Sequence, residues 1–309
     1  MIIDSSNNLY QFLLDEIYKS RGLDSLSDNA QEKFLQNLQP LASSLWKKYK
    51  SHHVEVPYDN KSYQECYLLR YFVPYSYFLS SVLEDIDFQK DFKEKKFVAT
   101  FFGSGPGPEV ISLIRYVEKL GNLDCLEINM IDVNNWSYST NILTKLLRSL
   151  SLNFKLKINI ERYDFNEFIE EDSLIEKIIS QSNLLLFQNC LNEFSTNGSC
   201  NSNMQTLVAE MPDHARIVFI EQSIKYSSSN HIVGQLLAIN DYSYYKFKLL
   251  AYKEKFIVNL SKVINSLPDI INQNLFTRDN NDEFFNKGLV LRKYHELCYF
   301  VLKREETNE

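Results

Sequence analysis

Three of the eight glycines in this 309-residue chain lie close together, at Gly103, Gly105 and Gly107. They follow the apolar run 97–102, and apolar residues then recur at helical spacing over 110–117. Glycines at such a strand-to-helix junction permit positive φ and let a ligand approach the backbone. The N-terminus of the helix presents unpaired N–H groups and the positive end of a dipole. This stretch therefore predicts a turn that binds a nucleotide-like ligand.

The spacing of the glycines argues against two common turns of this kind. A nicotinamide dinucleotide turn reads G-x-G-x-x-G, and a phosphate loop needs Gly-Lys-Ser or Gly-Lys-Thr. The chain instead reads G-x-G-x-G, with Ser104 between the first two glycines and Pro108-Glu109 after the third. We therefore expect a different nucleotide-like ligand.

Polar side chains also follow the next three predicted strands. They are Asp132 after 126–131, Asp164 beyond 155–160, and Asn189 after 184–187. Ligands of open α/β sheets bind beyond the carboxyl ends of the strands, so these side chains are expected beside the glycine turn. The alternative for both aspartates is a helix cap, because Asp is common at that position.

From residue 97 the sequence alternates between strand and helix patterns. Strands are predicted at 97–102, 126–131, 155–160, 184–187 and 216–220, and helices at 108–120, 136–150, 173–180 and 204–211. Largely apolar strands separated by helices indicate a parallel sheet that is covered on both faces. Right-handed crossovers make this an α/β fold with a doubly wound sheet.

The end of the chain departs from this alternation. Two β-like runs, 288–292 and 297–303, are separated by only four residues, which is too short for a parallel crossover. We therefore predict a C-terminal antiparallel hairpin, which completes a seven-stranded, mostly parallel sheet. The long segment 222–287 before it is predicted to be a helical insertion.

The first part of the chain has helical patterns. An aromatic segment at 63–75 contains one cation, Arg70, and a charged stretch at 85–96 separates it from the glycine turn. We expect an N-terminal helical region at 1–92, lying on the substrate side as a lid, and a second domain at 93–309. Arg70 either pairs with a surface carboxylate or reaches a bound ligand.

The glycine turn, the five strand–helix alternations and the terminal hairpin together resemble the class I S-adenosylmethionine-dependent methyltransferase superfamily. The resemblance covers about residues 95–303. It implies S-adenosylmethionine as the cofactor and transfer of its methyl group as the reaction.

The resemblance also implies roles for particular residues of the turn and the strand ends. Gly103, Ser104, Gly105 and Gly107 correspond to the glycine-rich motif that lies against the amino-acid part of the cofactor. Asp132 corresponds to the acid that accepts hydrogen bonds from both ribose hydroxyls, a role that suits the acceptor capacity of a carboxylate.

Further roles follow for the third and fourth strand ends. Asp164 is placed beside the adenine amino group, with Tyr163 and Phe165 as flanking faces. Residues 188–193 are where the family has its catalytic or substrate-facing motif. From that motif Asn189, Asn192 and Glu193 are the catalytic candidates, and Asn189 is also a candidate cofactor ligand.

The chain departs from the family pattern at one position. An acid that helps to hold the methionine amino group usually lies two residues before the first glycine, where this chain has Phe101. Arg70 is the candidate to pair with the methionine carboxylate. Cys190 lacks the adjoining proline of cytosine-C5 methyltransferases and is interpreted as a buried structural cysteine.

Composition limits the partners and the location. The net charge of −7 argues against non-specific coating of nucleic acid or of anionic membranes. No signal peptide or membrane-spanning run is recognisable. The five scattered cysteines fit reduced thiols in a cytoplasmic protein, and no metal-ligand spacing is present.

Three hypotheses for the function remain open. A small-molecule methyltransferase is favoured by the acidic charge. An RNA methyltransferase would use the segment 242–262, where lysines alternate with aromatic residues, although an amphipathic helix with a solvated lysine face is the favoured interpretation. The third hypothesis is a non-catalytic scaffold that binds S-adenosylmethionine.

Overall fold

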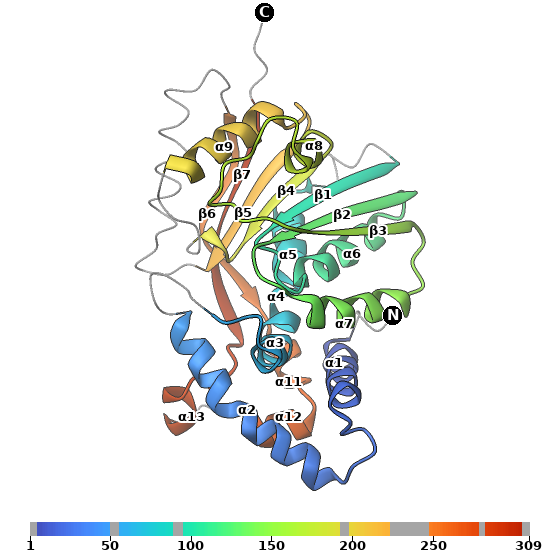
Figure 1. The fold of residues 1–309 in the computed structure, drawn as a ribbon, viewed down its shortest axis with the longest axis vertical. Coiled ribbons are helices and arrows are strands. Elements are labelled where there is room, and N and C mark those ends of the chain that lie inside the picture. The colour runs from blue at the N-terminus through green and yellow to red at the C-terminus, as the bar shows by residue number, and fades with distance from the viewer. Residues whose placement is uncertain are drawn as a thin grey trace, which may run out of the picture.

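The computed structural model describes residues 5–49, 56–88, 95–191, 198–222, 247–277 and 282–304. Figure 1 shows a twisted sheet with helices on both faces and a group of helices below it, which we call the helical cap. The cap contains α1, α2, α3, α4, α11 and α12, together with the described residues 56–60 that precede α3.

The strands and helices have the following bounds. The strands are β1 Lys96–Phe102, β2 Cys125–Asp132, β3 Lys155–Arg162, β4 Leu184–Gln188, β5 Arg216–Gln222, β6 Phe247–Asn259 and β7 Tyr294–Arg304. The helices are α1 Ser6–Arg21, α2 Asp28–Lys48, α3 Lys61–Tyr67, η2 Leu68–Phe72, α4 Val73–Tyr75, α5 Phe78–Asp85, α6 Pro108–Leu120, α7 Ser137–Arg148, α8 Leu174–Ser180, α9 Gly198–Glu210, α11 Ser261–Asn265, α12 Asp269–Asn274 and α13 Asp282–Asn286.

The sheet has the predicted topology. Its seven strands have the order β3-β2-β1-β4-β5-β7-β6. β1 to β5 pair in parallel, and β7 is antiparallel to both of its neighbours, β5 and β6. The predicted α/β, doubly wound, seven-stranded and mostly parallel sheet with an antiparallel C-terminal pair is therefore confirmed.

The partner of the last strand was predicted wrongly. β7 pairs with β6, which lies within the expected helical insertion 222–287 and not at 288–292. Residues 288–292 contain only an isolated bridge, between Val290 and Thr277. Two bulges and an exposed charged run at 253–255 interrupt the alternation of β6, which is why its period is not recognisable. Residues 223–246 of the insertion lie outside the described part.

Two hydrophobic clusters lie on opposite faces of the sheet. One includes residues of α8 and α9. The other includes residues of α5, α6 and α7 and continues into α1, α2 and α3. The described N-terminal helices therefore share one core with the sheet. The domain boundary at 92/93 falls within 89–94, outside the described residues, and stays a prediction.

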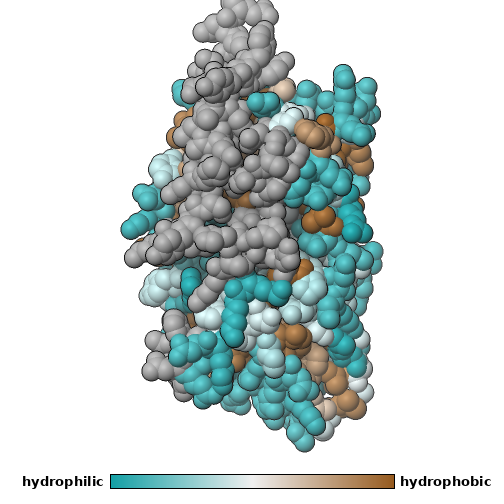
Figure 2. Space-filling view, turned by 60° about the vertical axis from the view of Figure 1, so that its left-hand side comes forward, coloured by the Kyte–Doolittle hydropathy of each residue, from teal (hydrophilic) through white to brown (hydrophobic). Residues whose placement is uncertain are grey.

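The described surface is largely hydrophilic on the face shown in Figure 2, where hydrophobic residues form separate patches. No helix among the described residues combines the length and hydrophobicity needed to span a membrane.

Candidate functional site

The glycine turn joins β1 to α6 in left-handed backbone conformations. Gly103, Gly105 and Gly107 have φ values of 60°, 52° and 80°. Gly107 is the N-cap of α6, and the helix begins at Pro108, which suits the first helical position because proline lacks an N–H. The backbone N–H of Gly107 donates to the carbonyl of Ser104 at 2.9 Å, which closes the turn.

The three glycines are required for different reasons. A Cβ at Gly103 would lie 2.6 Å from the Cβ of Cys190, and one at Gly107 would lie 2.6 Å from Met130 Cε. A Cβ at Gly105 would meet only the ring of Trp136, at 3.5 Å. Backbone conformation therefore favours glycine at all three positions, and packing adds to the requirement at 103 and 107.

Asp132 lies at the end of β2, beside the glycine turn. Its Oδ2 accepts from the N–H of Gly105 at 2.8 Å, and its Oδ1 accepts from the N–H of Asn134 at 2.8 Å. Burial raises the pKa of Asp132, while the N–H groups of Asn134 and Gly105 act in the opposite direction. Asp132 does not cap α7, whose N-cap is Trp136.

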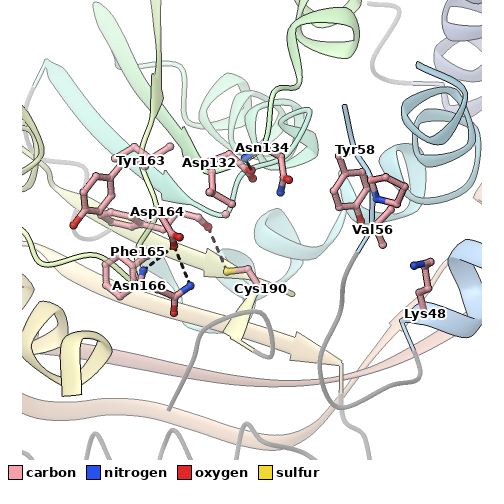
Figure 3. Close-up of a pocket in the computed structure, with 15 residues that line it drawn as sticks. Lys48, Val56, Tyr58, Asp132, Asn134, Tyr163, Asp164, Phe165, Asn166 and Cys190 are labelled. Carbon is pink, nitrogen blue, oxygen red and sulfur yellow. Dashed lines mark hydrogen bonds between the residues drawn. The ribbon is translucent and has the colours of Figure 1, made fainter. Parts of the chain in front are cut away.

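A cavity of about 480 Å³ lies beyond the ends of β1, β2 and β3. It brings together five of the residues predicted from the sequence, namely Gly103, Asp132, Tyr163, Asp164 and Phe165. Figure 3 shows Tyr163, Asp164 and Phe165 on one side, facing Val56, Tyr58 and Lys48 across the space. A cavity of this volume suits a ligand of cofactor size.

The residues beyond β3 are organised by short-range contacts. Asp164 Oδ1 accepts from the backbone N–H and the side-chain amide of Asn166, both at 2.9 Å. Tyr163 donates its hydroxyl to the carbonyl of Glu167 at 2.6 Å. No helix forms at 165–169, so Asp164 closes a turn and does not act as a helix cap.

Aromatic rings form the base of this cavity. Phe165 is buried, and its ring centroid lies 5.3 Å from those of Phe102 and Phe187. Phe102 and Phe187 stack at 4.8 Å across β1 and β4. The apolar base suits a flat aromatic group such as a nucleobase.

A second cavity of about 330 Å³ adjoins the same turn. It contains Ser104, Gly105 and Asp132, together with Trp136 and Asn134. Asp132 therefore lines both cavities.

The loop after β4 holds the candidate Asn189. Asn189 has a φ of 56°, and neither its Oδ1 nor its Nδ2 has a hydrogen-bond partner. Positive φ is uncommon at non-glycine residues, although Asn adopts it more readily than most, and such backbone strain clusters at functional sites. Asn192 and Glu193 lie outside the described residues. Cys190 is buried, as predicted, and donates its thiol to the carbonyl of Phe102 at 3.4 Å.

Glu221, at the end of β5, fixes this loop. Its Oε1 accepts from the N–H groups of Cys190 and Leu191 at 3.0 and 2.9 Å. Burial raises the pKa of Glu221 to about 7, opposed by these two N–H groups.

A second buried carboxyl group lies at the start of α6. Glu109 is 3% exposed, and its Oε1 accepts from Gln188 Nε2 at 2.9 Å. Its Oε2 and the Oε1 of Gln188 have no partner. Burial raises the pKa of Glu109 to about 8, and the charge of Asp132 acts in the same direction.

Phe101 and Arg70, which the sequence placed near the methionine part of the cofactor, do not line the cavities beside the glycine turn. Phe101 is 1% exposed and packs in the core with the N-terminal helices. The guanidinium of Arg70 lies against the rings of Tyr71 and Phe276.

Several cavity residues were not predicted from the sequence. They are Lys48, Val56, Pro57, Tyr58, Asn134 and Asn166. The first four come from the helical cap, and no motif marks them. Glu221 did carry a signal, because it ends a strand in the same way as Asp132.

Comparisons with known proteins give likeness of fold only. No family model matches the chain, and no curated protein matches it in sequence. The fold is similar to a putative class I S-adenosylmethionine-dependent methyltransferase from Listeria monocytogenes, at 12% identity and a TM-score of 0.45, covering 98% of this chain and 82% of that one.

Two further solved structures give similar values. One is the precorrin-6y C5,15-methyltransferase of Geobacter metallireducens, at 9% identity and a TM-score of 0.38, covering 72% of this chain and 88% of that one. The other is the glycopeptide N-methyltransferase MtfA, at 7% identity and a TM-score of 0.40, covering 72% of this chain and 89% of that one. Identities and TM-scores this low decide nothing about function, which has to be derived from the site of this chain.

Proposed function

We propose that the chain is an S-adenosylmethionine-dependent methyltransferase that acts on a small-molecule acceptor. The observation that carries the proposal is the cavity beyond β1, β2 and β3. Asp132 at its edge adjoins the glycine turn, and Asp164 with Phe165 lies at its far side. The resemblance expects the ribose and the adenine at these two places.

The fit to the cofactor rests on acceptor capacity and on shape. A carboxylate has about four lone pairs. Asp132 uses its hydrogen bonds to Gly105 and Asn134 to hold its carboxylate in place, which leaves capacity for two ribose hydroxyls. Asp164 retains acceptor capacity for an amino group, and Phe165 presents an apolar face.

When bound, the cofactor supplies a methyl group on a positively charged sulfur. The residues of the chain then have to align the acceptor and exclude water, which can account for much of the rate enhancement. Asn189, with an unpartnered carboxamide, is proposed to orient the acceptor. Asn192 and Glu193, which lie outside the described residues, stay candidates for further orienting groups, with Glu193 as a proton acceptor.

The helical cap is proposed to act as the lid of the site. It supplies Lys48, Val56, Pro57 and Tyr58 to the cavity wall. Tyr58 also packs on Trp136 at 4.2 Å, which connects the cap to the second cavity. Access to the site would therefore depend on movement of residues from the cap.

A small-molecule acceptor is preferred to RNA. Residues 247–259 of the basic-aromatic segment form β6, and not the expected amphipathic helix. Its Lys253 pairs with Asp85 at 2.8 and 2.9 Å, so this cation is already neutralised. The acidic net charge of −7 supports the same preference.

Calorimetric titration with S-adenosylhomocysteine tests the proposal. The wild type should bind, and Asp132→Asn should weaken binding at least about tenfold, or about 1.4 kcal/mol. Asp124→Asn is the control, because Asp124 is exposed and its carboxylate forms an ion pair with Lys95 at the surface. The absence of binding to the wild type at millimolar ligand would refute the proposal. Binding without methyl transfer to any of a broad set of acceptors would favour the scaffold hypothesis.

A further inference from the structure

Arg70 is a buried cation whose guanidinium group is only partly satisfied. Its residue is 5% exposed, and its Nε and Nη1 have no hydrogen-bond partner. No carboxylate of the described residues forms an ion pair with it. Its guanidinium lies 5.3 Å from the ring centroid of Tyr71 and 5.4 Å from that of Phe276. Burial of a charge without an ion pair costs several kcal/mol, so we expect Arg70 to destabilise the folded chain.

The backbone at Arg70 is also unusual. Arg70 lies at the centre of η2, a single π-helical turn between α3 and α4. Such turns are rare, and they occur frequently at functional sites. An unpaired buried charge and an unusual backbone turn therefore coincide at one residue.

Two other polar groups around Arg70 lack a hydrogen-bond partner, namely the hydroxyl of Tyr10 and the Nδ1 of His295. The hydroxyl of Tyr71 lies close enough to Arg70 for the guanidinium to act on its pKa, lowering it against the effect of burial. Burial, with the charges of Arg292 and Arg70, lowers the pKa of His295 to about 4, so the imidazole is neutral at pH 7. His295 and the tyrosine hydroxyls around Arg70 are therefore neutral hydrogen-bond donors, and they do not neutralise the positive charge of its guanidinium.

This cluster lies near the ends of β4 and β5. The ring of His295 is 6.3 Å from that of Tyr75, and the ring of Tyr75 is 5.3 Å from that of Tyr71. Tyr75 is itself tied to the strand ends, because its hydroxyl accepts from Gln222 at 2.6 Å. In Figure 1, α3 and α4 lie between the sheet and α12, which precedes Phe276.

We propose that Arg70, with His295 and Tyr71, binds an anionic group of the methyl acceptor, a carboxylate or a phosphate on a small molecule. This inference rests on the proposed function. Guanidinium groups form strong, charge-assisted hydrogen bonds with both anions. Arg292, which is exposed and three residues before His295, provides a positive charge on the solvent side that attracts the anion. Arg70 is thereby assigned to the acceptor and not to the methionine carboxylate.

The test uses Arg70→Met, which keeps the volume and removes the charge. In thermal unfolding without ligand, the variant should melt at a higher temperature than the wild type, because an unpaired buried charge is gone. Benzoate and phenyl phosphate at millimolar concentration are the probes. At least one should raise the melting temperature of the wild type and have no effect on the variant, and the two arms distinguish a carboxylate from a phosphate.

Arg115→Met is the matched control. Arg115 is also buried, but it donates to the carbonyl and the hydroxyl of Ser76 at 2.6 and 2.8 Å. Its replacement should therefore lower the melting temperature. Arg70→Lys, which retains the positive charge, should keep part of the stabilisation by the anion.

Titration with S-adenosylhomocysteine separates the two proposals. Its dissociation constant should change less than about twofold in Arg70→Met. A tenfold loss would show that Arg70 pairs with the carboxylate of the cofactor and would overturn the inference. A lowered melting temperature together with no response of the wild type to either anion would do the same. Failure of the wild type to bind S-adenosylhomocysteine would instead count against the proposed function.

Discussion

The Oδ2 atom of Asp132 accepts the backbone N–H of Gly105 at 2.8 Å. This bond links the end of β2 to the turn that follows β1, across two neighbouring strands. A carboxylate held in this way keeps its position before any ligand arrives, so binding would not have to order it. Asp132 can therefore hold the glycine turn in place and still accept hydrogen bonds from a ligand.

Alanine substitutions in the glycine turn should have unequal effects. Gly105→Ala should cost about 1–2 kcal/mol in the free energy of unfolding, because its φ of 52° disfavours a side chain. Gly103→Ala should cost more, since its Cβ would also lie 2.6 Å from the Cβ of Cys190. Urea unfolding of the two variants provides the measurement. Equal losses would mean that the loop after β4 moves away freely.

Most of the sheet could be predicted from the sequence because four strands are short, largely apolar runs and β3 alternates between polar and apolar residues. Each of these runs ends at a glycine or a polar residue, as β1 does at Gly103 and β2 does at Asp132. The polar residues at the strand ends also identified two parts of the cavity wall, Asp132 beside the glycine turn and residues 163–165, because the carboxyl ends of parallel strands are adjacent.

The remaining features depend on contacts that no local pattern encodes. β6 is an edge strand with two bulges, so its exposed lysines and its interrupted alternation hide its period. Lys48 and Tyr58 reach the cavity only because the helical cap packs over the strand ends. Asn192 and Glu193 lie outside the described residues and stay predictions.

The clamp formed by Glu221 should control the loop after β4. Glu221→Ala removes the acceptor for the N–H groups of Cys190 and Leu191. Hydrogen exchange in a peptide that covers 184–191 should then be faster by about tenfold, which corresponds to the loss of about 1.4 kcal/mol in local stability. Glu221→Gln retains an acceptor oxygen and should exchange nearly as slowly as the wild type. Equal exchange in the wild type and the alanine variant would show that the loop is held by other contacts.

The buried carboxyl group of Glu109 should make stability depend on pH. Its pKa is raised from 4.5 to about 8 in the folded chain, chiefly by burial. Between these values the unfolded chain releases the proton and the folded chain keeps it, so the stability of the wild type should fall as pH rises from about 4.5 to 8. Glu109→Gln does not titrate and still accepts from Gln188.

We therefore expect Glu109→Gln to gain melting temperature relative to the wild type as pH rises from 5 to 8. Above pH 8 the difference between the two melting temperatures should stay constant. Glu118→Gln, on the same helix but near the surface, controls for the general loss of a carboxylate. A gap for Glu109→Gln that stays constant across this range would show that the carboxyl group is already ionised in the folded chain. In that case an unrecognised cation or water would have to reach its Oε2.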